Sequence, residues 1–376
     1  MTARCIAVLA LSLLAGCAGT LAPTAPVVTT VTHRLAVSTD CHARPACFGT
    51  VQTAVDAAGT FPTPDPVTIA IGRGNFKERV EVRRANVALV GAGRGATRIY
   101  NDLVAETAGR YHRDHWGTPG SATLVVDADG VTVRGLTIEN TFDYLANDAL
   151  AAGAPGRIAN HQAVAVLLDI HSDRVLMEDV ALLGYQDTLF ANGRRGYIRN
   201  ALIAGNVDFI FGNGQLLIED SELRTRRRAK DERDNGFQSF LLAPSTQLSQ
   251  PFGIVVHRSR LTREAGVPDA SVALARPWHP TSRFADGRYA DPAAVGQALF
   301  IDCWMDRHIG PRHWTSMQGT ARDGTKTAIF TPQTSRFWET NAKGPGARHE
   351  DIGMSWRPAL SWPQMRARFF AGWPQA

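Results

Sequence analysis

Short β-branched segments recur along this chain at a spacing close to 20 residues, and this period restricts the possible folds more than any other feature. Most segments have an apolar pair, then a polar or small break, then another apolar residue. They lie at residues 131–138, 174–182, 196–203, 215–223, 253–261 and 298–305. Aligning the breaks places Asp179, Asn200 and Asp220 at intervals of 21 and 20 residues, and Gly135 lies 44 residues before Asp179.

A period near 20 with three short strands per turn is typical of a solenoid. We therefore predict an all-β fold, a single-stranded right-handed parallel β-helix with short capping helices. A leucine-rich repeat is disfavoured because its leucine spacing and asparagine ladder are missing, and a β-sandwich would not explain a fixed period. Successive turns of such a solenoid stack about 4.8 Å apart. Residues one period apart become neighbours, and the long exposed sheet forms a groove suited to a polymer.

Helices are expected only at the two ends of the solenoid. Residues 50–58 have helical spacing and can cap the first turn, which would otherwise expose sheet edges. Near the other end, Ser361 is a candidate N-cap and Pro363 lies in the first turn of a short helix that Gly372 and Pro374 would close. The aromatic side chains expected to pack this helix on the body are those of Trp362, Phe369, Phe370 and Trp373.

One glycine-rich run offers a false lead. Residues 91–96 resemble a dinucleotide-binding fingerprint, which requires a following helix within a βαβ unit. Residues 97–100 instead have the character of a strand, so we interpret the run as a turn.

The N-terminal segment has the features of an export signal. Arg4 precedes ten largely apolar residues, too few to span a bilayer, and Leu14-Ala-Gly-Cys17 follows. This tetrapeptide resembles a bacterial lipobox, in which Cys17 is lipidated; a plain secretory signal is the alternative. We predict a signal peptide at 1–16, a flexible linker at 17–40 with a Thr/Pro/Ala-rich beginning, and the folded body with its C-terminal tail at 41–376.

Composition and cysteine content set further limits. The chain is 44% hydrophobic and 20% charged, which is ordinary for a globular protein. Its net charge of +5 suits an anionic partner, but no basic run is interleaved with stacking aromatics, so nucleic acid is not expected. Cys41 and Cys47 could pair in an oxidising compartment. Cys303 is expected to be a small buried residue, and no metal-binding spacing is present.

Five polar residues carry the candidate chemistry: Gln162, Gln186, Asp187, Asp208 and Arg276. Both intervals within the set, 24 residues between the glutamines and 21 between the aspartates, are close to one period. The solenoid would therefore gather them on one face. Two adjacent carboxylates have pKa values that split, which leaves one as a proton donor and the other as an anionic nucleophile.

The other members of the set suit the same chemistry. The arginine could hold one aspartate ionised through a bidentate pair, and the two glutamine amides could donate to an oxyanion. Any one of these aspartates taken alone is better interpreted as a turn or ladder-capping residue. Because four polar residues recur at solenoid spacing, we instead interpret the set as a functional site.

The motifs around these residues resemble those of the pectinesterases, the β-helical pectin methylesterases of the pectin-lyase-like solenoid type. The resemblance extends from about residue 48 to residue 314. It rests on Gln162-Ala-Val-Ala165, Gly184-Tyr-Gln-Asp187-Thr-Leu-Phe190, Val207-Asp208-Phe-Ile-Phe-Gly212 and Leu274-Ala-Arg276-Pro-Trp278. Residues 276–291 are most similar to enzymes of Gram-negative bacteria, some of which are outer-membrane lipoproteins.

The resemblance implies a role for each residue. Asp208 corresponds to the nucleophile, and Asp187 to the acid that protonates methanol and then activates water. Gln162 and Gln186 correspond to the oxyanion donors, and Arg276 to the arginine that orients the nucleophile. The positions that correspond to substrate contacts are Trp278, Thr118, Arg228, Asn235, Thr281, Met317 and Phe211.

The chain also departs from the family pattern. Ala201 and Ser221 stand where many bacterial relatives have a disulfide, Ala275 replaces a glycine and Phe190 replaces a tyrosine. A long loop at 143–160 precedes Gln162 and is expected to border the groove. None of these changes removes a reactive group.

We therefore expect a monomeric pectinesterase without cofactor or metal, acting on methylated polygalacturonate. We expect it to be exported and lipid-anchored to the cell envelope at the outer membrane. The alternatives are an esterase or acyl-thioesterase of the same fold with another substrate, a retaining glycosidase using the paired carboxylates, and a non-catalytic polysaccharide-binding lipoprotein.

Overall fold

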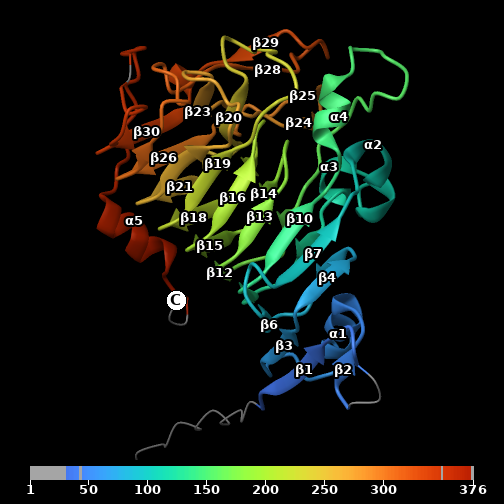
Figure 1. Cartoon of the computed structure of the whole chain (residues 1–376). Helices are drawn as coiled ribbons and strands as arrows, with labels where there is room; N and C mark the ends of the chain where they lie inside the picture. Colours follow the sequence, from blue (N-terminus) through green and yellow to red (C-terminus); the bar gives the residue numbers. More distant parts are fainter. Residues whose placement is uncertain (1–30, 42–44, 349, 374–376) are drawn as a thin grey trace, which may run out of the picture. The chain divides into compact units, whose positions relative to one another are not determined.

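The computed structural model describes residues 31–41, 45–348 and 350–373, and in this part of the chain three long parallel sheets form a solenoid (Figure 1). Each central coil contributes one strand to each sheet, and the next coil stacks its strands on the same three sheets. β12, β13 and β14, for example, are followed by β15, β16 and β17, each paired in parallel with the strand three before it. The predicted parallel β-helix is confirmed.

The strands of the three long sheets, in spatial order, have the following bounds. The 11-stranded sheet contains β2 (Cys47–Phe48), β1 (His33–Val37), β3 (Val67–Ile71), β6 (Val87–Gly91), β9 (Thr132–Arg134), β12 (Val175–Glu178), β15 (Arg195–Arg199), β18 (Gln215–Glu219), β21 (Ile254–His257), β26 (Gln297–Ile301) and β30 (Arg336–Thr340). The 8-stranded sheet contains β27 (Trp304–Met305), β22 (Arg260–Arg263), β19 (Glu222–Thr225), β16 (Leu202–Gly205), β13 (Ala181–Leu183), β10 (Thr137–Asn140), β7 (Thr97–Asn101) and β4 (Gly74–Lys77). The 7-stranded sheet contains β23 (Val272–Ala275), β20 (Ser239–Pro244), β17 (Ile210–Gly212), β14 (Leu189–Ala191), β11 (Val166–Leu168), β8 (Leu124–Val126) and β5 (Val80–Val82).

The remaining elements are short. Two antiparallel hairpins are formed by β24 (Thr281–Phe284) with β25 (Gly287–Ala290) and by β28 (Met317–Gly319) with β29 (Ala328–Phe330). The helices are α1 (Val51–Ala58), α2 (Ala105–Ala108), α3 (Gly117–Gly120), α4 (Tyr144–Ala149) and α5 (Trp362–Phe369), with 3-10 turns at Gly109–Tyr111 and Pro332–Thr334.

The breaks aligned in the sequence are the corners between the 11-stranded and 8-stranded sheets. Gly135, Asp179, Asn200 and Asp220 all have left-handed backbone, with φ between 49° and 63°. Glycine, asparagine and aspartate adopt this conformation most readily. A single left-handed residue turns the chain sharply from one sheet into the next, so the residue type at the corner repeats with the coil.

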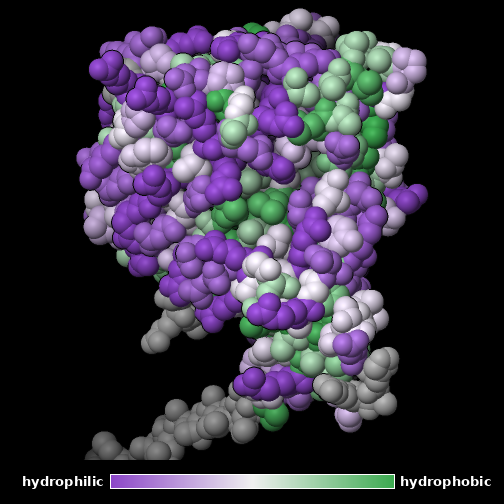
Figure 2. All heavy atoms as spheres, viewed as in Figure 1, coloured by the Kyte–Doolittle hydropathy of each residue, from purple (hydrophilic) through white to green (hydrophobic). Residues whose placement is uncertain are grey.

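Apolar ladders fill the interior of the solenoid. In the 8-stranded sheet, Ile138, Leu182, Ile203, Leu223 and Leu261 pair in register and have no exposed surface. Side chains alternate across a strand, so the residues on either side of this ladder face outward. Figure 2 shows a surface that is mainly hydrophilic, with a small hydrophobic patch near the middle of the view.

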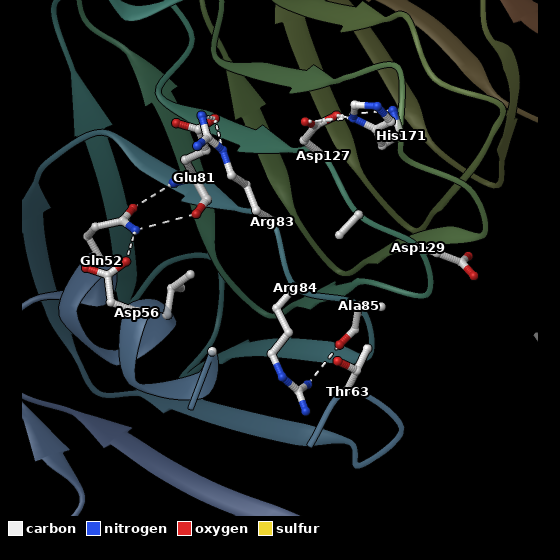
Figure 3. Close-up of a pocket in the computed structure, with 13 residues that line it drawn as sticks. Gln52, Asp56, Thr63, Glu81, Arg83, Arg84, Ala85, Asp127, Asp129 and His171 are labelled. Carbon is white, nitrogen blue, oxygen red and sulfur yellow. Dashed lines mark hydrogen bonds and ion pairs between the residues drawn. The ribbon is translucent and has the colours of Figure 1, made fainter. Parts of the chain in front are cut away.

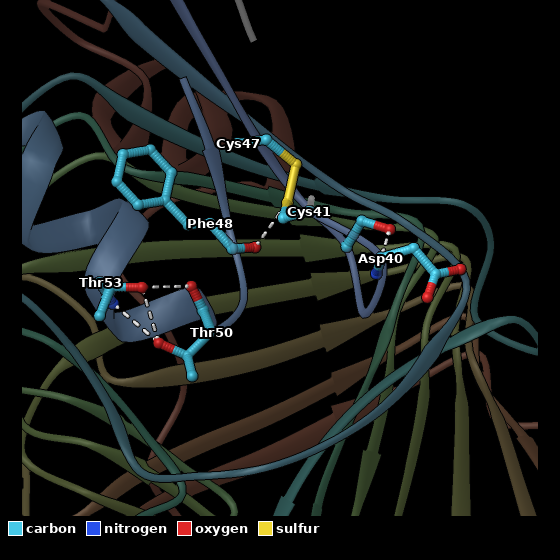
Figure 4. Close-up of a disulfide and its surroundings, with 7 residues drawn as sticks. Asp40, Cys41, Cys47, Phe48, Thr50 and Thr53 are labelled. Atoms are coloured by element: carbon cyan, nitrogen blue, oxygen red, sulfur yellow. Dashed lines mark hydrogen bonds between the residues drawn. A yellow bond between two sulfur atoms is a disulfide. The ribbon is translucent and has the colours of Figure 1, made fainter. Parts of the chain in front are cut away.

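The N-terminal end of the solenoid is capped as predicted. Thr50 accepts a hydrogen bond from the Thr53 N–H and starts α1, whose buried face covers the first coil. The Cys41–Cys47 disulfide lies beside this helix (Figure 4).

The predicted linker boundary at residue 40 is wrong. Residues 33–37 form β1, which pairs along its whole length with β3, so the folded body includes them. Leu35 and Val37 are buried and alternate with more exposed residues, a two-residue period that the Thr/Pro/Ala-rich stretch before it obscured. The predicted signal peptide and Cys17 lie outside the described residues.

The C-terminal segment packs on the outer face of the 11-stranded sheet. The Gln364 Oε1 accepts a hydrogen bond from the Ser361 N–H at 2.9 Å, so the predicted helix start is confirmed. The predicted aromatic residues join an apolar cluster with outward-facing residues of β12, β15, β18, β21 and β26. None of the helices described is long and apolar enough to cross a membrane.

Two smaller predictions are also confirmed. The glycine-rich run connects β6 directly to β7, and a side chain at Gly91 would collide with the Gly135 carbonyl oxygen, so close backbone packing explains this glycine. Cys303 is buried, and burial raises the pKa of its thiol to about 12. A thiol held protonated in this way is a poor nucleophile.

Candidate active site

Asp187 and Asp208 occupy equivalent corners of adjacent coils. Each has left-handed backbone, with φ of 64° and 48°, and each precedes a strand of the 7-stranded sheet by two residues. Leu189 pairs with Ile210, and the Asp187 N–H donates to the Val207 carbonyl at 3.1 Å. This register sets the two aspartates opposite each other, one strand spacing of about 4.8 Å apart. The predicted stacking of the two carboxyl-bearing residues is confirmed.

Arg276 clamps Asp208 from the end of β23. Its Nε and Nη2 donate to Oδ1 and Oδ2 of the carboxylate at 2.8 and 2.7 Å. The guanidinium also lies 3.8 Å from the centre of the Phe240 ring. Arg276 and Asp208 are each less than a tenth exposed. A bidentate charge-assisted pair of this kind fixes the plane of the Asp208 carboxylate and offsets its charge.

Asp187 lies in a different electrostatic environment. Burial, and then the negative charge of Asp208, raise the pKa of Asp187 well above its ordinary value, while Arg276 lowers it in part. Asp187 therefore keeps its proton to a higher pH than a solvated aspartate would. The two carboxyl groups are thus divided into a buried acid and a clamped carboxylate, the asymmetry that acid–base chemistry on a paired site requires.

Gln162 and Gln186 also lie on adjacent coils. The Ala163 N–H donates to the Gln186 carbonyl at 3.3 Å, which joins the two segments directly beside Asp187. Both glutamines are half-buried, and no hydrogen bond within the described part of the chain engages either side-chain amide. Their N–H groups can therefore donate to a bound group.

Aromatic side chains cover the outer face of the 7-stranded sheet next to the aspartates. Phe190 and Phe211 pair in register and stack at 4.2 Å, and Trp278 approaches their edges at 6.2 and 5.6 Å. Trp116 meets Phe190 edge-on at 5.5 Å and is 39% exposed. The sequence motifs indicated Phe211 and Trp278 but not Trp116, whose position two residues before Thr118 was the available signal.

The other predicted substrate contacts lie on surrounding loops and hairpins. Thr118 lies in α3 and Met317 starts β28, both half-buried. The Asn235 amide donates to the Ser316 carbonyl at 3.3 Å, which places it next to Met317. The hydroxyl of Thr281 shares a 2.7 Å hydrogen bond with that of Thr320.

Arg228 is engaged within the protein. Its Nη2 donates to Oδ1 of the buried Asp148 at 2.7 Å, and its side chain is only 14% exposed. This pair ties the basic run 226–230 to the loop 143–160. Tyr144 of the same loop stacks on Tyr185 at 5.1 Å, directly next to Gln186, so the loop borders the site as expected.

Ala201 and Ser221, the positions at which the sequence resemblance implies a disulfide in many bacterial relatives, also face each other across adjacent coils. The Ser221 Oγ accepts from the Ala201 N–H at 3.1 Å and donates to the Glu219 carbonyl. A hydrogen-bonded contact thus occupies the position of the missing covalent bridge.

A separate cavity of about 890 Å³ lies between α1 and the N-terminal end of the 7-stranded sheet (Figure 3). Neither Asp187 nor Asp208 lines it. Its polar side chains form hydrogen bonds with one another. Asp127 Oδ1 lies 3.0 Å from His171 Nδ1, and the Gln52 amide donates to Asp56 Oδ1 at 2.7 Å. We find no paired acid and carboxylate among its lining residues comparable to those at the coil corners.

Comparison with known proteins identifies the chain's relatives. Residues 36–359 match the family described as Pectinesterase. Pectinesterase A of Dickeya chrysanthemi is 39% identical over 302 residues, which are 79% of this chain and 81% of that protein. The structure of pectin methylesterase from Erwinia chrysanthemi is similar, with a TM-score of 0.81, 36% identity, and coverage of 92% of this chain and 99% of that one.

A further solved structure agrees. Pectin methylesterase from Yersinia enterocolitica is 40% identical, with a TM-score of 0.75, and the match covers 85% of this chain and 96% of that one. With the aspartate pair, its arginine and the two glutamines placed as described above, this chain belongs to the pectinesterase family of carboxylic ester hydrolases.

Proposed function

We propose that this protein hydrolyses the methyl esters of polygalacturonate through a covalent aspartyl intermediate. The observation that carries the mechanism is the asymmetry of the pair, in which Asp208 is held bidentately by Arg276 while Asp187 is buried beside it with a raised pKa. Family membership supports the ester as substrate. It favours an esterase over the glycosidase and the non-catalytic binding protein considered from the sequence.

In the first half-reaction, an Asp208 carboxylate oxygen attacks the ester carbonyl carbon. Negative charge develops on the carbonyl oxygen, and the amides of Gln162 and Gln186 donate hydrogen bonds to it. The bond to the methoxy oxygen breaks, and that oxygen takes the proton of Asp187 and leaves as methanol. The galacturonyl group remains joined to Asp208 as an anhydride.

In the second half-reaction, Asp187 acts as a base. It takes a proton from a water molecule, whose oxygen attacks the galacturonyl carbonyl carbon of the anhydride. The bond to Asp208 breaks, which releases the free galacturonate carboxyl group and restores the Asp208 carboxylate and the Asp187 acid. The net reaction consumes one water and yields one methanol, and it requires no metal or organic cofactor.

The decisive experiment measures methanol release from highly methylated pectin by the parent and by Asp208→Asn. We expect the variant to lose at least about a thousandfold in kcat, because the attacking group is removed. Asp220→Asn is the matched control, since Asp220 has the same left-handed backbone at another corner and pairs with Arg258 away from the site. Mass spectrometry of acid-quenched parent enzyme should find a galacturonyl adduct on the peptide containing Asp208. Full activity in Asp208→Asn would refute the mechanism.

The same site could act on a different ester or on an acyl-thioester. Equal amounts of enzyme assayed for methanol release from pectin and for hydrolysis of an acyl-thioester separate these substrates. We expect pectin to be preferred, because the chain matches the pectinesterase family and because the half-buried Trp278, packed on Phe211 beside the aspartates, offers an aromatic face to a sugar ring.

We further propose that the protein is exported, lipidated at Cys17 and anchored to the outer membrane as a monomer. The support is the sequence Leu14-Ala-Gly-Cys17 after a short apolar segment. In a Gram-negative host, labelled palmitate should be incorporated into the parent and not into Cys17→Ser, which should move from the membrane fraction to the soluble fraction. Light scattering of the soluble Cys17→Ser protein measures its mass and tests whether it is a monomer.

A further inference from the structure

We infer that Asp234 is a positioning residue that occupies the outer edge of Arg276, so that the guanidinium holds the nucleophile and does not bind free sugar carboxylates. The enzyme would thereby favour esterified over unesterified galacturonate beside the reacting ester. This inference rests on the proposed function, because it takes Asp208 as the nucleophile.

The contact itself divides the guanidinium between two carboxylates. Arg276 uses Nε and Nη2 for Asp208, and its Nη1 donates to Asp234 Oδ2 at 2.7 Å. Arg276 is buried, whereas the Asp234 side chain is 55% exposed. The carboxylate of Asp234 therefore covers the side of the guanidinium that points toward solvent.

A tight turn holds this carboxylate in place. Asn235 and Gly236 have φ of 52° and 92°, and Asp234 and Phe237 exchange both backbone hydrogen bonds, at 2.8 and 3.0 Å. Asparagine–glycine is the preferred pair for a two-residue hairpin turn with positive φ at both central positions. The Asn235 amide also donates to Asp234 Oδ1 at 3.0 Å.

A neighbouring loop braces the same turn. Arg312 Nη2 donates to the Asn235 carbonyl at 2.5 Å, and its guanidinium lies 5.0 Å from the centre of the Phe237 ring. The position of Asp234 is thus built into the backbone. It does not depend on the chance conformation of an exposed side chain.

The electrostatic consequence concerns the product of the reaction. An uncovered guanidinium edge is a strong site for a carboxylate, and ester hydrolysis creates a carboxylate next to Arg276. By formal count, the two carboxylates that contact Arg276 carry one more negative charge than its guanidinium neutralises. A neutral ester is not repelled by this charge, but a free galacturonate carboxylate is. Because Asp234 is half exposed, salt should weaken the repulsion.

The test measures how strongly polygalacturonate inhibits methanol release from highly methylated pectin at low ionic strength. In Asp234→Asn, we expect the inhibition constant to fall about tenfold or more, since the repelling charge is gone and a substrate carboxylate can displace the neutral amide oxygen from the guanidinium edge. The ratio of kcat/KM for highly methylated over sparsely methylated pectin should fall in parallel. Asp234→Glu should restore part of the discrimination, and added salt should shrink the difference between parent and variant.

Asp231→Asn is the control, because Asp231 is an exposed acid of the same loop that binds Arg233 and Gln238 and makes no contact with Arg276. Its inhibition constant should match that of the parent. An unchanged inhibition constant and substrate ratio in folded Asp234→Asn would overturn the inference, even if kcat were lower, because only a structural role would then remain. The proposed function is tested by a different variant. If Asp208→Asn remained active, the proposed mechanism would be wrong whatever the result for Asp234→Asn.

Discussion

The two aspartates at the site occupy backbone positions that few residue types accept, and this has a consequence for how they should be substituted. Their φ values are 64° and 48°, a region where asparagine is tolerated almost as well as aspartate. Asparagine therefore removes the charge and keeps the corner, whereas alanine also adds backbone strain.

The first prediction follows from this conformation. Asp208→Ala should unfold at a lower denaturant concentration than Asp208→Asn, with a difference in the free energy of unfolding of about 1 kcal/mol. Urea unfolding followed by circular dichroism measures the difference. Equal midpoints with equal slopes would show that the left-handed corner does not restrict the residue at this position.

The second prediction concerns the pH dependence of catalysis. The first half-reaction requires protonated Asp187, so kcat/KM should fall as pH rises through the pKa of Asp187, which burial and Asp208 raise. Asp208→Asn removes one of the two causes and should lower the pKa of Asp187. Carboxyl carbon NMR of isotope-labelled aspartate in both proteins measures this shift directly. A higher pKa in the variant would contradict the assigned coupling.

At the scale of the strand and coil, the register of the strands places two buried residues where a disulfide could join adjacent coils. Leu202 pairs with Glu222, so the preceding residues, Ala201 and Ser221, are also opposite each other, and both are buried. Their N–H to Oγ hydrogen bond at 3.1 Å shows that the two positions face each other.

The third prediction is therefore that Ala201→Cys combined with Ser221→Cys forms a disulfide. Residues on neighbouring strands have suitable Cα separations for a bridge. Closing a loop of this length should add about 2–4 kcal/mol to the free energy of unfolding, less any strain. Thiol titration and urea unfolding with and without reductant test both statements. Each single cysteine variant is a control, and a free-thiol double variant would show that the register does not bring the two side chains close enough.

At the scale of the whole molecule, an acid-sensitive residue lies buried in the body. His308 has no exposed surface, and burial lowers its pKa to about 4 from an ordinary value of 6.5. Because the unfolded chain binds this proton more readily, stability is fully present above pH 6.5 and is lost as pH falls toward 4.

The fourth prediction is a loss of up to about 3 kcal/mol of unfolding free energy between pH 6.5 and 4 from this one histidine. His308→Leu keeps a similar volume and cannot take up a proton, so its stability should fall less steeply over the same range. Urea unfolding at several pH values gives both slopes. Identical slopes for parent and variant would remove His308 as a source of acid sensitivity.

The sequence alone determined the features that repeat with the coil. The spacing of Asp179, Asn200 and Asp220 predicted the corners, and the 21-residue interval between Asp187 and Asp208 predicted that they face each other. The physical reason is that a parallel solenoid places residues one period apart on neighbouring strands. A count along the chain therefore predicts a contact in space.

Only the tertiary structure decided the contacts made by loops whose lengths do not follow this period. Asp234 contacts Arg276 across 42 residues, and Arg228 pairs with Asp148 across 80. These separations are about two and four periods, which would place the partners two and four coils apart, so spacing alone predicts neither contact. The strand at 33–37 was missed for a related reason, since these five residues are held as a strand by pairing with β3 on one side and β2 on the other. Short strands gain most of their stability from their neighbours, and that information is not local to the segment.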